Sequence, residues 1–193
     1  INRESAPGPD GYPSSFYRTS WDVVKTDVTA AVLDFFRGDH LPRVACTTTV
    51  VFLPKVKNPS STSHYRPVSL CNIPHNILAS LINARMSSHI PWWVSLKQHG
   101  LVKGRSIQEE ISLDQEMIRD INVKSRGSNL AIKLDMNQDY DRMEWGFINN
   151  VLVIMGFSWN IDIIFRCFSS SWLAVMFMGK GYGFFKASQG LRQ

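Results

Sequence analysis

The first part of the chain has apolar residues at helical spacing, followed closely by a β-branched segment. Together these patterns predict a mixture of helices and strands. Apolar residues recur there at spacings of three and four, at Trp21, Val24, Val28, Val32 and Phe35. This spacing predicts an amphipathic helix that ends at Gly38. Residues 47–53 are β-branched and apolar, which predicts a strand.

Patterns further along the chain extend this mixture. Helical spacing predicts helices near residues 77–85, 144–155 and 160–170, and a longer helix from Ser106 to about Lys124. The expected fold class is therefore α+β, with helices grouped around a small, mostly antiparallel sheet.

Two further segments are predicted to be extended. Residues 129–134 form a short apolar run, which predicts a strand with Asp135 at its end. Residues 173–178 and 182–187 flank Gly179-Lys180-Gly181, which predicts a hairpin.

The composition fits a folded domain and permits a nucleic-acid partner. Of the 193 residues, 44% are hydrophobic, and Lys plus Arg outnumber Asp plus Glu by 21 to 16, a net charge of +5. A mildly basic balance allows binding to RNA or DNA without establishing it. Three cysteines without a C-x-x-C pair indicate free thiols in a reducing compartment. The sequence lacks an apolar run of roughly 18 residues and an apolar leader, so we expect no membrane span and no signal peptide.

Asp135 is the strongest candidate for catalysis. A carboxylate at the end of an apolar strand suits Mg²⁺, which needs rigid oxygen ligands. Nucleotidyl transfer uses two metals about 3.5–4 Å apart, and a single aspartate cannot build that site. Taken alone, the segment is more typical of an ordinary strand end with solvated acids than of a metal site.

The order of several motifs adds specificity. The blocks are Ala6–Gly11, Phe52–Lys55, Tyr65–Asn72, Gln98–Arg105, Lys133–Trp145, Gly183–Lys186 and Ser188–Gln193. Together they resemble the ordered motif series of plant non-LTR (LINE-type) retrotransposon reverse transcriptases. The resemblance implies a partial right-hand polymerase: a linker at residues 1–20 and an incomplete reverse transcriptase domain at 21–193. Within that domain, residues 21–125 match the fingers and residues 126–193 the first half of the palm.

The resemblance also implies roles for residues of the palm. Asp135 matches the catalytic aspartate that binds both Mg²⁺ ions, and Met136 would lend a backbone carbonyl to one of them. Tyr140 matches the aromatic residue that packs under the deoxyribose, although it could equally be a core residue. Gln193 matches a glutamine near the nucleotide and template.

Basic residues of the fingers have implied roles too. Lys55 and Arg66 match residues that grip the incoming triphosphate, where Arg offers a bidentate fork and Lys a point charge. Lys103 and Arg105 flank a glycine in a loop and are candidates for contacts with template phosphates. Each has a plainer alternative as a solvated residue, a local ion pair or a basic loop.

Aromatic and charged residues near the metal motif are expected to be structural. Asp141 and Arg142 are expected to form a local ion pair. Trp145, Phe147 and Trp159 are expected to lie in the core rather than to stack on bases.

The chain departs from the family pattern in ways that bear on activity. Gln138-Asp139 replaces the usual Lys-Ala. The added carboxylate would lie beside the expected triphosphate pocket and repel the triphosphate. The second metal motif, a Tyr-x-Asp-Asp hairpin, is not in the sequence, and we expect that both ends, at Ile1 and Gln193, are cut. We therefore expect that this chain does not polymerise DNA, and that exposed edges and apolar faces make it poorly soluble.

The leading hypothesis is an RNA-directed DNA polymerase domain that uses two Mg²⁺ ions in the complete parent. Its partners would be an RNA template, a DNA primer or target and deoxynucleoside triphosphates, with no membrane and no evident protein partner. The alternative is a non-catalytic, nucleic-acid-binding remnant of a retroelement. Either would be intracellular, in the nucleus or the cytoplasm.

Overall fold

The computed structural model describes residues 5–119, 121, 123, 127, 129–134, 139–157 and 161–191. The chain divides into two units. The first combines Ile1–Ile82 with Gln138–Gln193, and the second is Asn83–Asn137. The first unit is therefore built from two stretches that lie far apart in the sequence.

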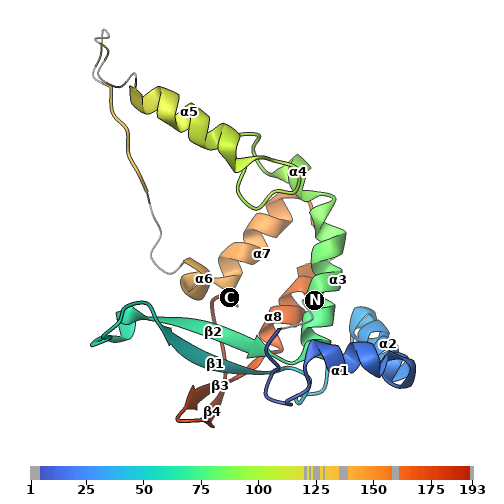
Figure 1. The fold of residues 1–193 in the computed structure, drawn as a ribbon. Helices are drawn as coiled ribbons and strands as arrows, with labels where there is room; N and C mark the ends of the chain where they lie inside the picture. Colours follow the sequence, from blue (N-terminus) through green and yellow to red (C-terminus); the bar gives the residue numbers. More distant parts are fainter. Residues whose placement is uncertain are drawn as a thin grey trace. The chain divides into compact units, whose positions relative to one another are not determined.

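A four-stranded sheet forms the centre of the first unit. Its strands are β1 (Thr47–Pro54), β2 (Tyr65–Cys71), β3 (Trp172–Phe177) and β4 (Lys180–Lys186). The strands lie in the order β2-β1-β3-β4 (Figure 1). β1 pairs antiparallel with β2 and parallel with β3, and β3 pairs antiparallel with β4. Over the residues that the structure describes, the α+β class and the mostly antiparallel sheet are confirmed.

Helices flank the strands in the sequence. Those of the first unit are α1 (Ser14–Thr19), α2 (Trp21–Arg37), η1 (a 3-10 turn, Thr62–His64), α3 (Ile73–Ser87, which runs on into the second unit), α6 (Asp139–Arg142), α7 (Trp145–Ile154) and α8 (Ile161–Ser169). Those of the second unit are α4 (Ile90–Trp93) and α5 (Ile107–Arg119). The helices predicted before Gly38, near 77–85, near 144–155 and near 160–170 are confirmed. Helix α1 occupies part of the opening segment that the sequence reading takes as a loop.

The β3–β4 hairpin is confirmed, but its turn lies one residue earlier than predicted. The turn residues are Met178 and Gly179, with φ angles of 48° and 75°. Two consecutive positive φ angles give the type I′ geometry that matches the twist of paired strands. Lys180 is therefore the first residue of β4 and pairs with Phe177.

The core of the first unit joins α2, α3 and α8. Its buried members are Phe35, Leu41, Cys46, Leu78 and Cys167. Arg166 of α8 donates hydrogen bonds to the carbonyls of Phe35 (3.0 Å) and Asp39 (2.9 Å), which satisfies acceptors at the end of α2. The ring of His75, on α3, contacts the Cys167 carbonyl at 2.8 Å. Cys46, Cys71 and Cys167 form no disulfide with one another, as expected.

The predicted strand at residues 129–134 is wrong. None of these residues pairs with a strand, and Leu130 and Leu134 are 80% and 88% exposed. The preference of apolar residues for strands depends on a neighbouring strand that completes the hydrogen-bond ladder, and this segment has none. The Asn129 amide instead donates to the carbonyls of Ile121 and Val123.

Helix α5 is also shorter than predicted, because it ends at Arg119 rather than near Lys124. Apolar residues of α5 and residues 129–134 line a space of about 1150 Å³ within the second unit. The large apolar side chains that remain exposed there include Met117 and Ile118. They agree with the expectation that apolar surface is left uncovered.

Candidate functional site

The residues proposed for metal binding lie outside the part of the chain that the structure describes. These are Asp135 and Met136, and the same holds for Gln193, proposed near the nucleotide. Among the described residues, no group of three or more His, Cys, Asp or Glu side chains could hold a metal ion. The described residues therefore do not make a two-Mg²⁺ site, and the metal assignment stays a prediction.

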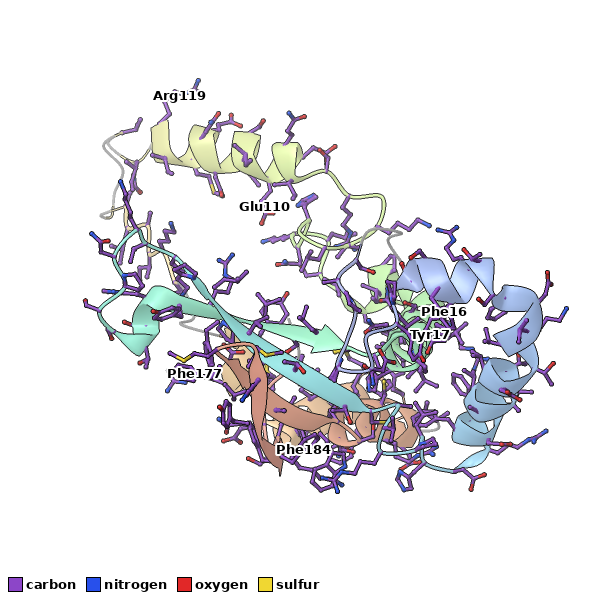
Figure 2. The ribbon with its side chains drawn as sticks, turned by 60° about the horizontal axis from the view of Figure 1, so that its bottom comes forward. Phe16, Tyr17, Glu110, Arg119, Phe177 and Phe184 are labelled. Carbon is purple, nitrogen blue, oxygen red and sulfur yellow. The ribbon has the colours of Figure 1, made fainter. Side chains whose placement is uncertain are left out.

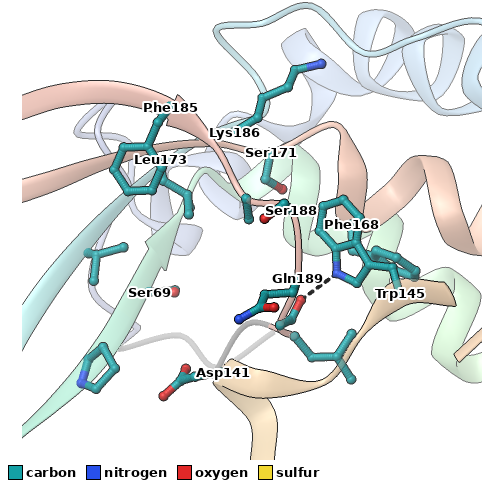
Figure 3. A pocket seen from close by; sticks show the side chains of 15 residues that line it. Ser69, Asp141, Trp145, Phe168, Ser171, Leu173, Phe185, Lys186, Ser188 and Gln189 are labelled. Atoms are coloured by element: carbon teal, nitrogen blue, oxygen red, sulfur yellow. Dashed lines mark hydrogen bonds between the residues drawn. The ribbon is translucent and has the colours of Figure 1, made fainter. Parts of the chain in front are cut away.

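The segment that follows the metal motif is tied to the last predicted block. The amide of Gly190 donates to the Met143 carbonyl (2.7 Å), and the amide of Leu191 donates to the Tyr140 carbonyl (2.6 Å). The indole Nε1 of Trp145 donates to the Gly190 carbonyl at 2.8 Å (Figure 3). Three hydrogen bonds thus join two blocks that lie far apart in the sequence.

Gly190 is required for this contact on two grounds. Its φ of 85° lies in the left-handed region, which residues other than glycine rarely adopt. A Cβ atom at this position would also lie 2.8 Å from the carbonyl oxygen of Asp141. The backbone of residues 188–191 can therefore approach α6 only because residue 190 is glycine.

The residues of this contact line part of an open cavity of about 370 Å³ on one face of the sheet. The strands contribute apolar side chains, including Val50, Leu173 and Phe185. The polar lining residues are Ser69, Asp141, Ser171, Ser188 and Gln189 (Figure 3). A cavity with an apolar floor and a few polar groups is typical of a small-molecule site.

The charge of the cavity comes mainly from Asp141. No ion pair is found between Asp141 and Arg142 in the described part of the chain, so the predicted local pair is not formed there. Lys186 also lines the cavity, but its side chain points away from it (Figure 3), and its ammonium lies 5.2 Å from the Trp172 ring. A carboxylate without a cationic partner disfavours phosphate, so the cavity suits a neutral or cationic group better than a triphosphate.

Lys55 and Arg66 lie at the same end of the β1–β2 hairpin. Arg66 pairs with Leu53, and the Lys55 amide donates to the His64 carbonyl at 2.8 Å, so the two basic residues are near neighbours across the strands. Both are exposed. Because side chains alternate along a strand, Arg66 projects from the face opposite to Pro67, which lines the cavity. The structure thus brings the two cations together, but outside the cavity.

The aromatic residues near the metal motif differ in how far they are buried. Tyr140 is 39% exposed, so it is not a core residue. Trp145 is partly buried and packs against Phe165 and Phe168, with ring centroids 5.7 and 5.4 Å away. Phe147, which was expected in the core, is 58% exposed, so that expectation is wrong. Trp159 lies outside the described residues.

Arg105 organises its own loop in the second unit. Its guanidinium donates to the carbonyls of Ser95 (2.5 Å), Gln98 (2.6 Å), Pro91 (3.0 Å) and Val94 (3.1 Å). Lys103, two residues earlier, is exposed. The donors of Arg105 are thus directed at the chain itself, whereas Lys103 is accessible to a template.

Arg105→Lys is expected to loosen this loop, because a lysine ammonium cannot reproduce the planar fork that reaches four carbonyls. We expect a local loss of about 2 kcal/mol, from acceptors left unsatisfied. Limited proteolysis should cut the variant between residues 91 and 105 faster than the parent. Lys103→Gln, at an exposed position in the same loop, is the matched control, and equal cutting of both variants would contradict this role.

Sequence reasoning missed the residue that anchors the opening loop. Asn72 is 1% exposed, and its amide nitrogen donates to the Val44 carbonyl at 2.7 Å. Its amide oxygen accepts from the Asp10 amide at 3.2 Å. A Cβ atom on Gly8 would lie 2.2 Å from that same oxygen. The Pro- and Gly-rich composition of the loop was the available signal, since close backbone approach requires glycine.

The same loop affects one titratable group. Burial, and then the negative charge of Asp10, raise the pKa of the Tyr17 phenol above its ordinary value. The raised pKa favours the neutral phenol, which packs beside the loop without bringing a charge.

No helix in the described residues has both the length and the apolar character to cross a membrane.

Comparison with known proteins finds similarity to a transposon-encoded protein. No family model matches the chain. Over 155 residues it is 26% identical to Transposon TX1 uncharacterized 149 kDa protein of Xenopus laevis. The match covers 79% of this chain and 12% of that protein, so the chain spans a small part of the relative. The chain is thus similar to a segment of a transposon-encoded protein.

Proposed function

We propose that the chain is the fingers and first palm segment of an RNA-directed DNA polymerase from a LINE-type retrotransposon. The contact between residues 140–145 and residues 188–191 carries the proposal, because it joins the two blocks whose residues Tyr140 and Gln193 the resemblance assigns to the nucleotide. Similarity to a transposon protein supports the origin. The more specific resemblance to plant elements stays a prediction.

Each residue would act in a defined way in this function. Lys55 and Arg66, at one end of the β1–β2 hairpin, would bind the triphosphate by charge-assisted hydrogen bonds. Tyr140, exposed on α6, would pack against the sugar. Asp135 and the Met136 carbonyl would hold Mg²⁺, which neutralises phosphate charge when bound.

Nucleotide binding tests the proposal directly. A fluorescent deoxynucleoside triphosphate, titrated with and without Mg²⁺, should bind in a metal-dependent manner. Lys55→Gln and Arg66→Gln should each weaken binding about tenfold or more, since a hydrogen bond to a charged group contributes roughly 1.5–3 kcal/mol. Asp135→Asn should remove the Mg²⁺ dependence.

Lys25→Gln serves as the control for these variants, because Lys25 is an exposed cation on α2, away from the hairpin. Metal-independent binding that none of the three variants alters would contradict the proposal. Primer extension with this chain is expected to give no product.

A second candidate is nucleic-acid binding without catalysis, and the net charge of +5 favours it. Binding of RNA that falls steeply with salt and needs no Mg²⁺ would support this candidate. In either case, RNA and DNA inside the cell, in the nucleus or cytoplasm, would be the partners.

A further inference from the structure

Two cations and two aromatic rings form a cluster at the base of the β3–β4 hairpin. The Arg43 guanidinium lies 3.8 Å from the centroid of the Trp172 ring and 5.3 Å from that of Phe184. The Lys186 ammonium lies 5.2 Å from the Trp172 centroid. Trp172 is therefore flanked by two positive charges.

The sheet fixes the positions of these side chains. Trp172 pairs with Lys186 across β3 and β4, and the Trp172 amide donates to the Cys46 carbonyl at 3.2 Å. The register shifts between Leu173 and Val175, opposite the stretch of β4 that holds Phe184. Arg43 lies in the turn that precedes β1. Four residues from three segments thus meet at one place on a rigid scaffold.

The rings and ammonium of this cluster lie on the sheet face opposite to the cavity. Leu173 and Phe185 line the cavity, and the side chains of their sequence neighbours Trp172 and Lys186 alternate to the other face. Lys186 is also a lining residue of the cavity, but its side chain points away from it (Figure 3). The cluster and the cavity that contains Asp141 therefore share Lys186 and open on different faces.

The cluster is open to solvent. Phe184 is 57% exposed, and Arg43 and Lys186 are both exposed (Figure 2 labels Phe184). None of the ion pairs in the described residues involves Arg43 or Lys186. An aromatic face and two cations without acidic partners are thus available to a partner.

The chemistry of the cluster selects one class of partner. Cations without acidic partners attract a polyanion, and a guanidinium stacked on a ring keeps its N–H edge free to bind phosphate. An exposed ring binds a base whose π-face is free, as in a single strand but not within a stacked duplex. We propose that Arg43, Trp172, Phe184 and Lys186 form a binding surface for single-stranded nucleic acid. The surface goes beyond the proposed nucleotide site and requires neither Mg²⁺ nor catalysis.

Fluorescence anisotropy with labelled single strands of about 15 nucleotides, long enough to cover such a surface, tests the proposal. Phe184→Leu should weaken binding about tenfold through the loss of one base stack, and Phe184→Trp should retain it. The double variant Arg43→Gln/Lys186→Gln should lower the slope of log affinity against log salt by about 1.4, or 0.7 for each lost phosphate contact.

Two exposed residues of the same types on other elements provide matched controls: Phe147→Leu on α7 and Arg18→Gln on α1. Both should bind like the parent chain, and circular dichroism should show that all variants are folded. Parent-like affinity of Phe184→Leu and an unchanged salt slope of the double variant would overturn the proposal, as would equal losses in the controls. Duplex binding as tight as single-strand binding, with the same losses, would show that the partner class is wrong. Mg²⁺-dependent nucleotide binding is a separate measurement, so it can fail or succeed independently of this surface.

Discussion

Asn72→Ala is expected to lower the free energy of unfolding by about 3 kcal/mol, since it removes a buried side chain and two part-buried hydrogen bonds to the backbone. The Val44 carbonyl loses its donor, and the Asp10 amide loses its acceptor. The side chain is also almost fully buried, so its removal leaves a cavity. Urea unfolding should show a lower midpoint with an unchanged slope.

Asn58→Ala is the control for this substitution, because Asn58 is an exposed asparagine near the end of the β1–β2 hairpin. Its effect should stay within about 0.5 kcal/mol, as for most surface substitutions. If both variants unfold at the same urea concentration, Asn72 does not anchor the opening loop to the sheet.

Gly190→Ala is expected to separate residues 188–191 from α6. The added Cβ atom would meet the Asp141 carbonyl at 2.8 Å, and the φ of 85° disfavours alanine. Together these effects should cost about 2 kcal/mol. Hydrogen exchange should report a loss of protection of about 30-fold at the Leu191 amide, which donates to the Tyr140 carbonyl.

Gly146→Ala provides the contrast within the same unit. Gly146 lies in α7, and a Cβ atom there would meet nothing within 4 Å. Alanine in a helix is favoured over glycine by up to about 1 kcal/mol, so this variant should be as stable as the parent or more so. Full protection of the Leu191 amide in Gly190→Ala would show that the contact tolerates a side chain.

The elements that could be predicted from the sequence are those whose signal is local. Helix α2 follows from the spacing of its apolar residues, and β1 from its β-branched run. β2 is not among the predicted strands, and it contains Pro67, which lacks the N–H that a central strand needs. The structure places β2 at the edge of the sheet, where proline is tolerated. Residues 129–134 show the converse, since a strand-like composition does not form a strand where the described residues offer no neighbouring strand.

The sequence predicts the candidate site only as a set of motifs, and the contacts between those motifs could not be predicted from it. Neither the fit of Gly190 against Asp141 nor the anchoring of Asp10 by Asn72 follows from spacing, since each depends on how distant segments fold onto one sheet. Arg105 shows the same limit in another form. Its charge suggested template binding, whereas its donors bind four carbonyls of its own loop.

The parallel pairing of β1 with β3 has a consequence for synthesis of the chain. Thr47 pairs with Trp172, so one edge of β1 stays open until β3 has been translated. The β1–β2 hairpin can form early, but a two-stranded hairpin alone is marginally stable in water. Residues 83–137 must also be made before the sheet can close. Such a long-range closure folds slowly and leaves a strand edge exposed on the ribosome, where chaperone binding would protect it from aggregation.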